Sequence, residues 1–242
     1  MKIFTLYPPP GIKFNLNQGG NMNFNILKLL YLGMAILLPT MAQAGVNSGD
    51  TAWVSTSTAL VLFMTLPGLA LFYTGLVQSK NAVSVMIHHF AIACLASVIW
   101  VVVGYSLAFS EGNEWVGGLS NAFLTKMLYN SVNGTIPESI FVTFQMTFAL
   151  MVPVLITGAW AEKFHFYNSC LFMIIWPFLV YYPIAHWIWG GGWLTNFGKN
   201  IGTLGVLDYA GGLVIHTTSG ISSLVISISL QKRRICKNNF KN

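Results

Sequence analysis

Five long apolar stretches, separated by short polar segments, dominate the sequence after residue 50. They cover residues 52–77, 85–109, 138–160, 166–189 and 209–230. Each is long enough to cross the ~30 Å hydrocarbon layer of a bilayer as a helix, which takes about 20 residues. A helix satisfies its own backbone hydrogen bonds in lipid, whereas an open sheet leaves its edges unpaired. The pattern therefore predicts an all-α membrane protein with five transmembrane helices.

Composition supports this class and narrows the function. Only 7% of the residues are charged and 55% are hydrophobic, whereas soluble domains carry about 25% charged residues. The net charge of +6 does not indicate nucleic-acid binding, because the basic residues are not gathered on a soluble domain. The three cysteines show no spacing typical of a metal site or a disulfide framework. We expect no cofactor and no nucleic-acid partner.

The N-terminal region reads as a processing segment rather than part of the fold. Residues 22–44 combine Lys28, an apolar run over 29–38 and the small-residue site Ala42-Gln43-Ala44, the pattern of a cleavable signal peptide. Residues 1–21 lack this pattern, and we interpret them as an extension from a misassigned upstream start. The folded domain is expected at residues 45–231, followed by a basic cytoplasmic tail at 232–242.

Charges beside the apolar stretches predict the orientation. Cleavage of a signal leaves the mature N-terminus outside, on the periplasmic side in a bacterium. The loops that then lie inside hold Lys80, Lys163 and five basic residues of the tail, while the outer connections hold Lys126 and Lys199. This bias follows the positive-inside rule. The expected location is the bacterial inner (plasma) membrane, multi-pass, with the N-terminus outside and the C-terminus cytoplasmic.

His216 is the residue in the last stretch that most needs a reason. It follows Asp208 by eight residues, which places it about 12 Å further along a helix and inside the hydrocarbon layer. A ring facing lipid there would lose its hydrogen bonds, so it should face protein or a pore. A pore-lining ring and a buried ring bonded to a neighbouring helix both meet this requirement.

Asp208 also has two interpretations. It precedes the last helix and can cap it by accepting from the backbone donors of Ala210 or Gly211. Its negative charge could instead help hold a cation at a pore mouth.

Three aromatic residues are the remaining site candidates. Trp189, in "PIAHWIWGGGW" (183–193), fits an aromatic belt or a ring that presents its face to a cation. Phe144 and Phe148 lie four residues apart and share one helix face. They fit core or lipid-facing rings, or a hydrophobic constriction that admits only small species. The adjacent His88 and His89 are interpreted as interfacial.

Four stretches together resemble the ammonium transporter family, which includes methylammonium permeases and Rhesus proteins. They are "ALVLFMTLPGLALFYTGLVQSKN" (59–81), "TFQMTFALMVPVLITGAWAEKFHF" (143–166), "YPIAHWIWGGGWL" (182–194) and "DYAGGLVIHTTSG" (208–220). The last is close to the family signature, an aspartate, an aromatic residue and Ala-Gly-Gly, with a histidine eight places after the aspartate. The resemblance covers about residues 50–231.

The resemblance implies roles for these residues. Trp189 matches a tryptophan that recruits ammonium at an outer vestibule by cation–π contact, and Phe148 matches a ring that lines that site and gates the pore, with Phe144 beside it. Asp208 matches an aspartate that supports the recruitment site. His216 matches the first of two histidines along a hydrophobic path, where the family separates ammonia from its proton and passes both inward. Methylammonium is expected as a substrate analogue.

The resemblance also implies an incomplete fold. Family members have about eleven spanning helices in two inverted five-helix repeats, and this chain matches the first repeat only. The second pore histidine, the serine of the recruitment site and the second half of the gate lie outside the match. We interpret the ending "RICKNNFKN" as a frameshifted or truncated tail. Two copies would rebuild a pore only if one inserted upside down, which the charge bias opposes.

Two functions follow as hypotheses. The first is transport of ammonium or ammonia, incomplete in this chain. The second is a non-transporting truncated product or an accessory subunit of full-length homologues, since the family forms trimers; a homotrimer is the other assembly considered. An enzyme is not expected, because the sequence contains no nucleophile–base pair, metal cluster or phosphate loop.

Overall fold

A computed structural model describes residues 45–200 and 205–230. The predicted upstream extension, signal peptide and basic tail lie outside the described residues. Within the described part, five helical segments are long and apolar enough to cross a membrane: Ser48–Gly75, Ser79–Phe109, Glu138–Trp160, Phe166–Phe197 and Gly212–Ser229. The five predicted helices are confirmed, and the third has the predicted bounds.

The third span is the single helix α6, and the other four spans are each assembled from shorter elements. The α-helices are α2 (Ser48–Phe63), α3 (Ala70–Gly75), α4 (Ala82–Ile99), α5 (Tyr105–Phe109), α6 (Glu138–Trp160), α7 (Phe166–Trp176), α8 (Tyr182–Ile188), α9 (Trp193–Asn200) and α10 (Thr218–Ser229). Between them lie π or 3-10 turns η1 (Met64–Leu69), η2 (Ser79–Asn81), η3 (Trp100–Gly104), η4 (Ala122–Leu124), η5 (Pro177–Tyr181) and η6 (Gly212–Thr217). Strands β1 (Val132–Asn133) and β2 (Ile136–Pro137) form a short antiparallel pair.

Local chemistry explains where the helices begin and widen. The first starts at Ser48, earlier than hydropathy predicted, because the Asn47 side chain accepts from the backbone N–H groups of Gly49 and Asp50. The π turns η1 and η5 contain Pro67 and Pro177. A proline has no N–H for the regular helical bond, so the backbone there adopts the wider turn.

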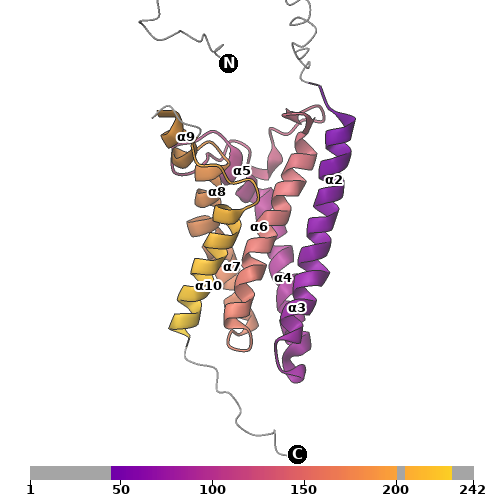
Figure 1. Cartoon of the computed structure of the whole chain (residues 1–242), viewed down its shortest axis with the longest axis vertical. Coiled ribbons are helices and arrows are strands. Elements are labelled where there is room, and N and C mark those ends of the chain that lie inside the picture. The colour runs from indigo at the N-terminus through magenta and orange to yellow at the C-terminus, as the bar shows by residue number, and fades with distance from the viewer. Residues whose placement is uncertain (1–44, 201–204, 231–242) are drawn as a thin grey trace, which may run out of the picture. The chain divides into compact units, whose positions relative to one another are not determined.

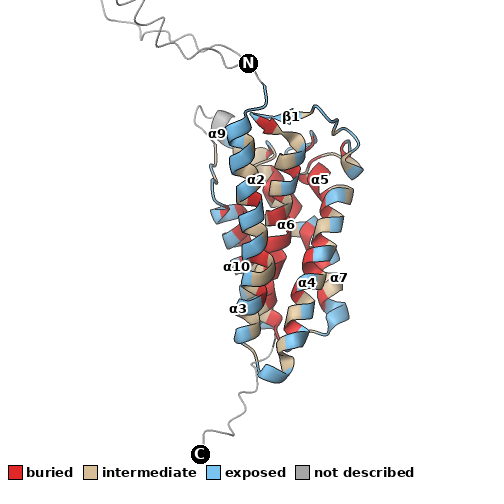
Figure 2. Ribbon diagram, turned by 90° about the vertical axis from the view of Figure 1, so that its right-hand side faces the viewer, coloured by how far each residue is buried: buried red, intermediate tan, exposed pale blue. Residues whose placement is uncertain are grey.

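α6 is the central helix of the bundle. Figure 1 shows it between α2 and α10, and Figure 2 shows buried residues along its length. α2, α4 and α10 pack against α6, and α7 packs against α4. In the most apolar part of the third span, 61% of the residues are buried, compared with 17% in the first span and 22% in the fifth. The first and fifth spans therefore lie at the edge, with uncovered faces.

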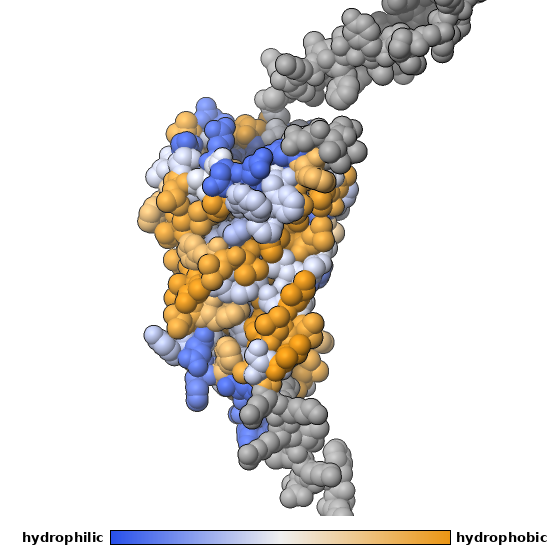
Figure 3. Space-filling model, turned by 90° about the vertical axis from the view of Figure 1, so that its left-hand side faces the viewer, coloured by the Kyte–Doolittle hydropathy of each residue, from blue (hydrophilic) through white to orange (hydrophobic). Residues whose placement is uncertain are grey.

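The surface is that of a membrane protein. Figure 3 shows a broad hydrophobic band across the middle of the bundle, with hydrophilic residues toward both ends. Large apolar side chains of the spanning helices are exposed, among them Leu60, Phe63 and Ile228. Lipid is the environment in which such a surface is stable. The chain is a multi-pass integral membrane protein.

The two ends of the bundle differ in their connections. We call the end with the long 110–137 loop the cap end, and the end with the short turns at 76–81 and 161–165 the turn end. At the cap end, His186 is 3% exposed, and its two ring nitrogens lie 3.0 Å from Ala108 O and 2.9 Å from Asn113 O. This buried ring fastens the long loop to α8.

Candidate functional site

Phe144 and Phe148 lie one turn apart on α6. Their ring centroids are 4.8 Å apart and their planes meet at 78°, the edge-to-face geometry that aromatic pairs favour. Both side chains are partly buried. The two rings thus form one aromatic surface on the central helix.

Trp189, directly after α8, completes this surface from a second helix. Its ring centroid is 6.1 Å from that of Phe148, at an interplanar angle of 52°. Its indole Nε1 donates to the backbone oxygen of Asp208 at 2.8 Å. The structure therefore brings Phe148, Trp189 and Asp208 together from three separate segments.

The Asp208 carboxylate caps the last span. Oδ1 accepts from Gly212 N at 2.8 Å, and Oδ2 accepts from the backbone N–H groups of Leu213 and Val214, each at 2.9 Å. The predicted donors, Ala210 and Gly211, were wrong, because Gly211 has φ +74° and the helix begins only after it. Both carboxylate oxygens are therefore engaged with the orphan donors of a helix N-terminus.

His216 lies in the π turn η6. Its backbone N–H donates to Gly211 O, five residues back, at 2.8 Å. The side chain is exposed, while the neighbouring Val214 and Ile215 are buried. The interpretation of His216 as a ring buried against a neighbouring helix was therefore wrong for the described residues. The last span packs on α6 by one face only, and His216 points from another.

A groove of about 360 Å³ lies further along this span, at the turn end. Ser223 and Ser227 line it and follow His216 by two and three helical turns, so they share its side of the helix. The opposite wall includes Tyr73 and Gly158. A Cβ on Gly158 would lie 2.5 Å from the Tyr73 ring, so only glycine allows this close approach.

His89 is a buried structural residue. It is 2% exposed, with Nδ1 3.0 Å from Val85 O and Nε2 3.0 Å from Thr157 Oγ1. The interpretation of this histidine as interfacial was wrong, because the ring turns into the contact between α4 and α6. The spacing of His89 from buried Val85 and Ile92 on one face of α4 was a signal that could have revealed this.

The described part of the chain contains no group of side chains suited to bind a metal ion. There, no three His, Cys, Asp or Glu side chains are grouped closely enough to hold an ion. The predicted site residues supply aromatic ring faces, one capped helix terminus and one exposed imidazole.

The sequence is similar to that of known ammonium transporters. The sequence profile of the Ammonium Transporter Family matches residues 52–241. An ammonium transporter of Bacillus subtilis (strain 168) is 47% identical over 188 residues, covering 77% of this chain and 45% of the relative. Ammonium transporter 1 of Dictyostelium discoideum is 40% identical over 196 residues, covering 79% of this chain and 41% of the relative.

Solved structures agree in fold. The crystal structure of Candida albicans Mep2 matches with a TM-score of 0.68 at 36% identity, covering 78% of this chain and 40% of that one. Saccharomyces cerevisiae Mep2 matches with the same TM-score at 32% identity, covering 82% and 44%. The chain spans less than half the length of these relatives. With five spanning helices and a profile match over most of its length, the chain belongs to the ammonium transporter family.

Proposed function

We propose that the chain takes part in transmembrane transport of ammonium or ammonia, with its cap end outside the cell. The observation that carries this proposal is the contact of Phe148 with Trp189, together with the bond from Trp189 to Asp208.

Recruitment at the cap end would use ring faces. A cation over an indole or phenyl face gains about 0.5–2 kcal/mol, more when water is excluded. Trp189 and Phe148 are partly buried and held at an angle of 52°, so a small ammonium ion could contact both. Asp208 would act indirectly, because its carboxylate is used in capping and its backbone oxygen fixes the indole.

Conduction would then pass Phe144 and Phe148 as the gate and use His216 as a polar handle. A neutral imidazole can both donate and accept, which suits ammonia in an otherwise apolar path. The exposed ring supplies one wall of such a path, and the groove beside Ser223 and Ser227 would continue it toward the cytoplasm. A second wall would have to come from another polypeptide segment.

The exposed face favours a second candidate function. A chain that leaves His216 uncovered, and that spans less than half of its relatives, could bind full-length homologues as an accessory subunit without conducting alone. Expression with and without a full-length relative distinguishes this from transport. An accessory role changes the relative's uptake, whereas the chain alone gives none.

Methylammonium uptake in cells that lack other ammonium carriers tests the transport proposal. We expect uptake with the wild-type chain, abolished by His216→Ala and reduced by Trp189→Leu. Thr217→Ala is the matched control, because Thr217 is also exposed on η6 but its hydroxyl is bonded to Gly212 O. Equal uptake with and without the chain, at verified membrane levels, would rule out transport by the chain alone.

A further inference from the structure

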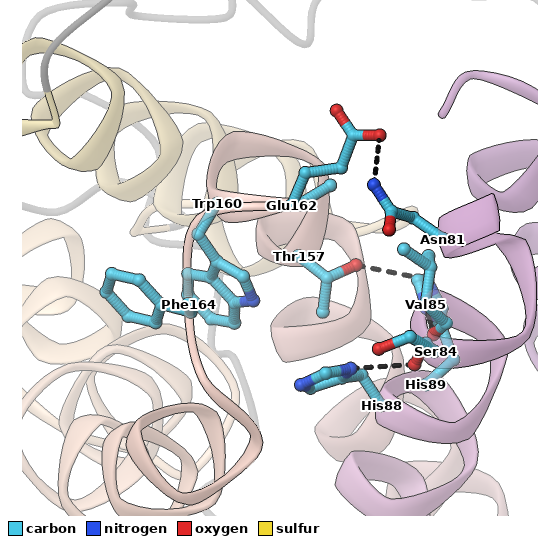
Figure 4. Close-up of a pocket in the computed structure, with 10 residues that line it drawn as sticks. Asn81, Ser84, Val85, His88, His89, Thr157, Trp160, Glu162 and Phe164 are labelled. Atoms are coloured by element: carbon cyan, nitrogen blue, oxygen red, sulfur yellow. Dashed lines mark hydrogen bonds between the residues drawn. The ribbon is translucent and has the colours of Figure 1, made fainter. Parts of the chain in front are cut away.

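A cavity of about 160 Å³ lies at the turn end, between the start of α4 and the end of α6 (Figure 4). Its polar lining comprises Asn81, Ser84, His88 and His89 on one side and Thr157, Trp160 and Glu162 on the other. None of the residues proposed for transport lines it. The volume has room for a small molecule and a few waters, which occupy about 30 Å³ each.

His88 leaves one ring nitrogen without use in this cavity. Its Nδ1 lies 2.7 Å from Ser84 O, and because a carbonyl oxygen only accepts, Nδ1 carries the hydrogen. In the neutral ring, Nε2 then has a lone pair, and this atom is buried without a hydrogen-bond partner among the described residues. Buried acceptors are nearly always paired, so Nε2 requires a donor from outside the described chain.

Asn81 supplies a second acceptor. Its Nδ2 donates to Glu162 Oε1 at 2.9 Å, and its amide oxygen is turned the other way, toward the cavity (Figure 4). Glu162 Oε1 also accepts from Gln78 N at 2.9 Å, which fixes the carboxylate at the rim. Glu162 has φ 67°, a left-handed conformation that residues other than glycine rarely adopt. A constrained turn thus holds a carboxylate beside two acceptors.

The aromatic side chains of this cavity, Trp160 and Phe164, stack on each other, unlike Trp189 and Phe148 at the cap end. Trp160 stacks its ring face on Phe164, with centroids 5.1 Å apart and planes at 6°, and turns its indole edge toward the cavity (Figure 4). The stacked face is covered by Phe164. The indole edge carries only an N–H donor, so recognition of a cation in this cavity would depend on the lone pairs of the other side chains.

We propose that this cavity binds ammonium or a small primary ammonium ion, held by N–H donation to His88 Nε2 and Asn81 Oδ1 beside the Glu162 carboxylate. The ion combines positive charge with several N–H donors, which is the complement of an acceptor-lined cavity. K⁺ carries the same charge but has no hydrogen to donate. Since the cavity is separate from His216, it binds the ion at the turn end beside the conduction face. The inference rests on the proposed function in one respect: transport would bring ammonium to the turn end.

Histidine NMR of the full chain in lipid nanodiscs tests the site. The chain has five histidines, which can be labelled with ¹⁵N and assigned by substitution. We expect methylammonium chloride to give a saturable shift of the His88 ring nitrogens, and KCl at equal concentration to give none. His88→Gln should weaken the binding about tenfold or more, measured by calorimetry. His216→Ala is the matched control and should retain the His88 shift.

Three results would overturn the site: no saturable change at His88, an equal change with KCl, or an equal change with tetramethylammonium, which has no N–H. The wild-type titration decides even where His88→Gln fails to fold. The test is also independent of transport. A chain that gives no uptake but shows the His88 shift contradicts the proposed function and supports the site, and the opposite pair of results does the reverse.

Discussion

At the cap end, the polar groups of Trp189 and Asp208 are bonded within the fold, whereas at the turn end the Nε2 atom of His88 has no partner among the described residues. The Trp189 indole donates to Asp208 O, and the Asp208 carboxylate accepts from three backbone N–H groups. His88 Nε2 is buried without a partner among the described residues. At the cap end a cation could therefore contact aromatic ring faces that hydrogen bonds hold in place. At the turn end it could donate hydrogen bonds to unused acceptor atoms.

This difference has an energetic consequence. Removing a polar group that the fold uses leaves other buried groups unpaired, at about 1–3 kcal/mol each. Removing an acceptor that the fold does not use removes its desolvation penalty as well. Substitutions at the cap end should thus lower stability, and His88 substitutions should alter binding with little loss of stability.

Gly190→Ala should have the largest effect on stability. A Cβ at Gly190 would lie 1.9 Å from Ala108 O and 2.7 Å from His186 Nδ1. The backbone next to Trp189 must move, and the contacts of His186 with Ala108 O and with Asn113 O in the 110–137 loop must break. We expect a loss of about 3 kcal/mol or more in the free energy of unfolding, measured by denaturation in detergent. Gly75→Ala, where a Cβ meets nothing within 4 Å, should be close to neutral. Equal effects of the two changes would contradict the packing of the cap end.

Asp208→Ala should have the next largest effect. Three backbone N–H groups lose their acceptor, and loss of a helix cap lowers stability by up to about 2 kcal/mol. Uptake should fall as well, because the segment without its cap holds the backbone oxygen of residue 208, which accepts from the Trp189 indole, less firmly in place. Glu114→Gln, which removes an exposed carboxylate at the same end, is the control. If Glu114→Gln lowers uptake as strongly as Asp208→Ala, general charge attraction rather than capping governs recruitment.

Trp189→Phe should have a smaller effect. The ring face remains, but the bond from Nε1 to Asp208 O is lost, worth about 1 kcal/mol. We expect a several-fold rise in the KM for methylammonium with little change in maximal uptake. Trp187→Phe loses a comparable indole bond, 2.7 Å to Trp115 O, without facing Phe148. A KM change of the same size in Trp187→Phe would show that the bond, and not its place beside Phe148, is what matters.

Sequence patterns predicted what depends on neighbours along the chain. The five helices follow from hydropathy, the Phe144–Phe148 pair from helical spacing, and the capping role of Asp208 from its place before an apolar run. The exact donors to Asp208 were missed because a positive φ at Gly211 delays the helix.

Contacts between distant segments could not be predicted in the same way. Hydropathy gives each residue one value, whereas His186 contacts Ala108 across 78 positions and His89 contacts Thr157 across 68. The exposure of His216 depends on which face of the last span packs on α6. That packing is set only when the helices assemble. The expectation that a histidine within the membrane faces protein or a pore therefore could not show that the His216 side chain is exposed in this bundle.

His88→Leu should change the free energy of unfolding less than the three substitutions at the cap end. The substitution loses the bond from Nδ1 to Ser84 O but also removes a buried acceptor that the described chain leaves unpaired. These contributions oppose each other and are of similar size, so we expect a change within about 1 kcal/mol. The neighbouring His89→Leu is the matched comparison, because both His89 nitrogens are bonded within the fold, to Val85 O and Thr157 Oγ1. Unfolding of the two variants in the same detergent should therefore show the larger loss for His89→Leu. A larger loss for His88→Leu would mean that the fold itself uses His88 Nε2, and the acceptor would then not be available to an ammonium ion.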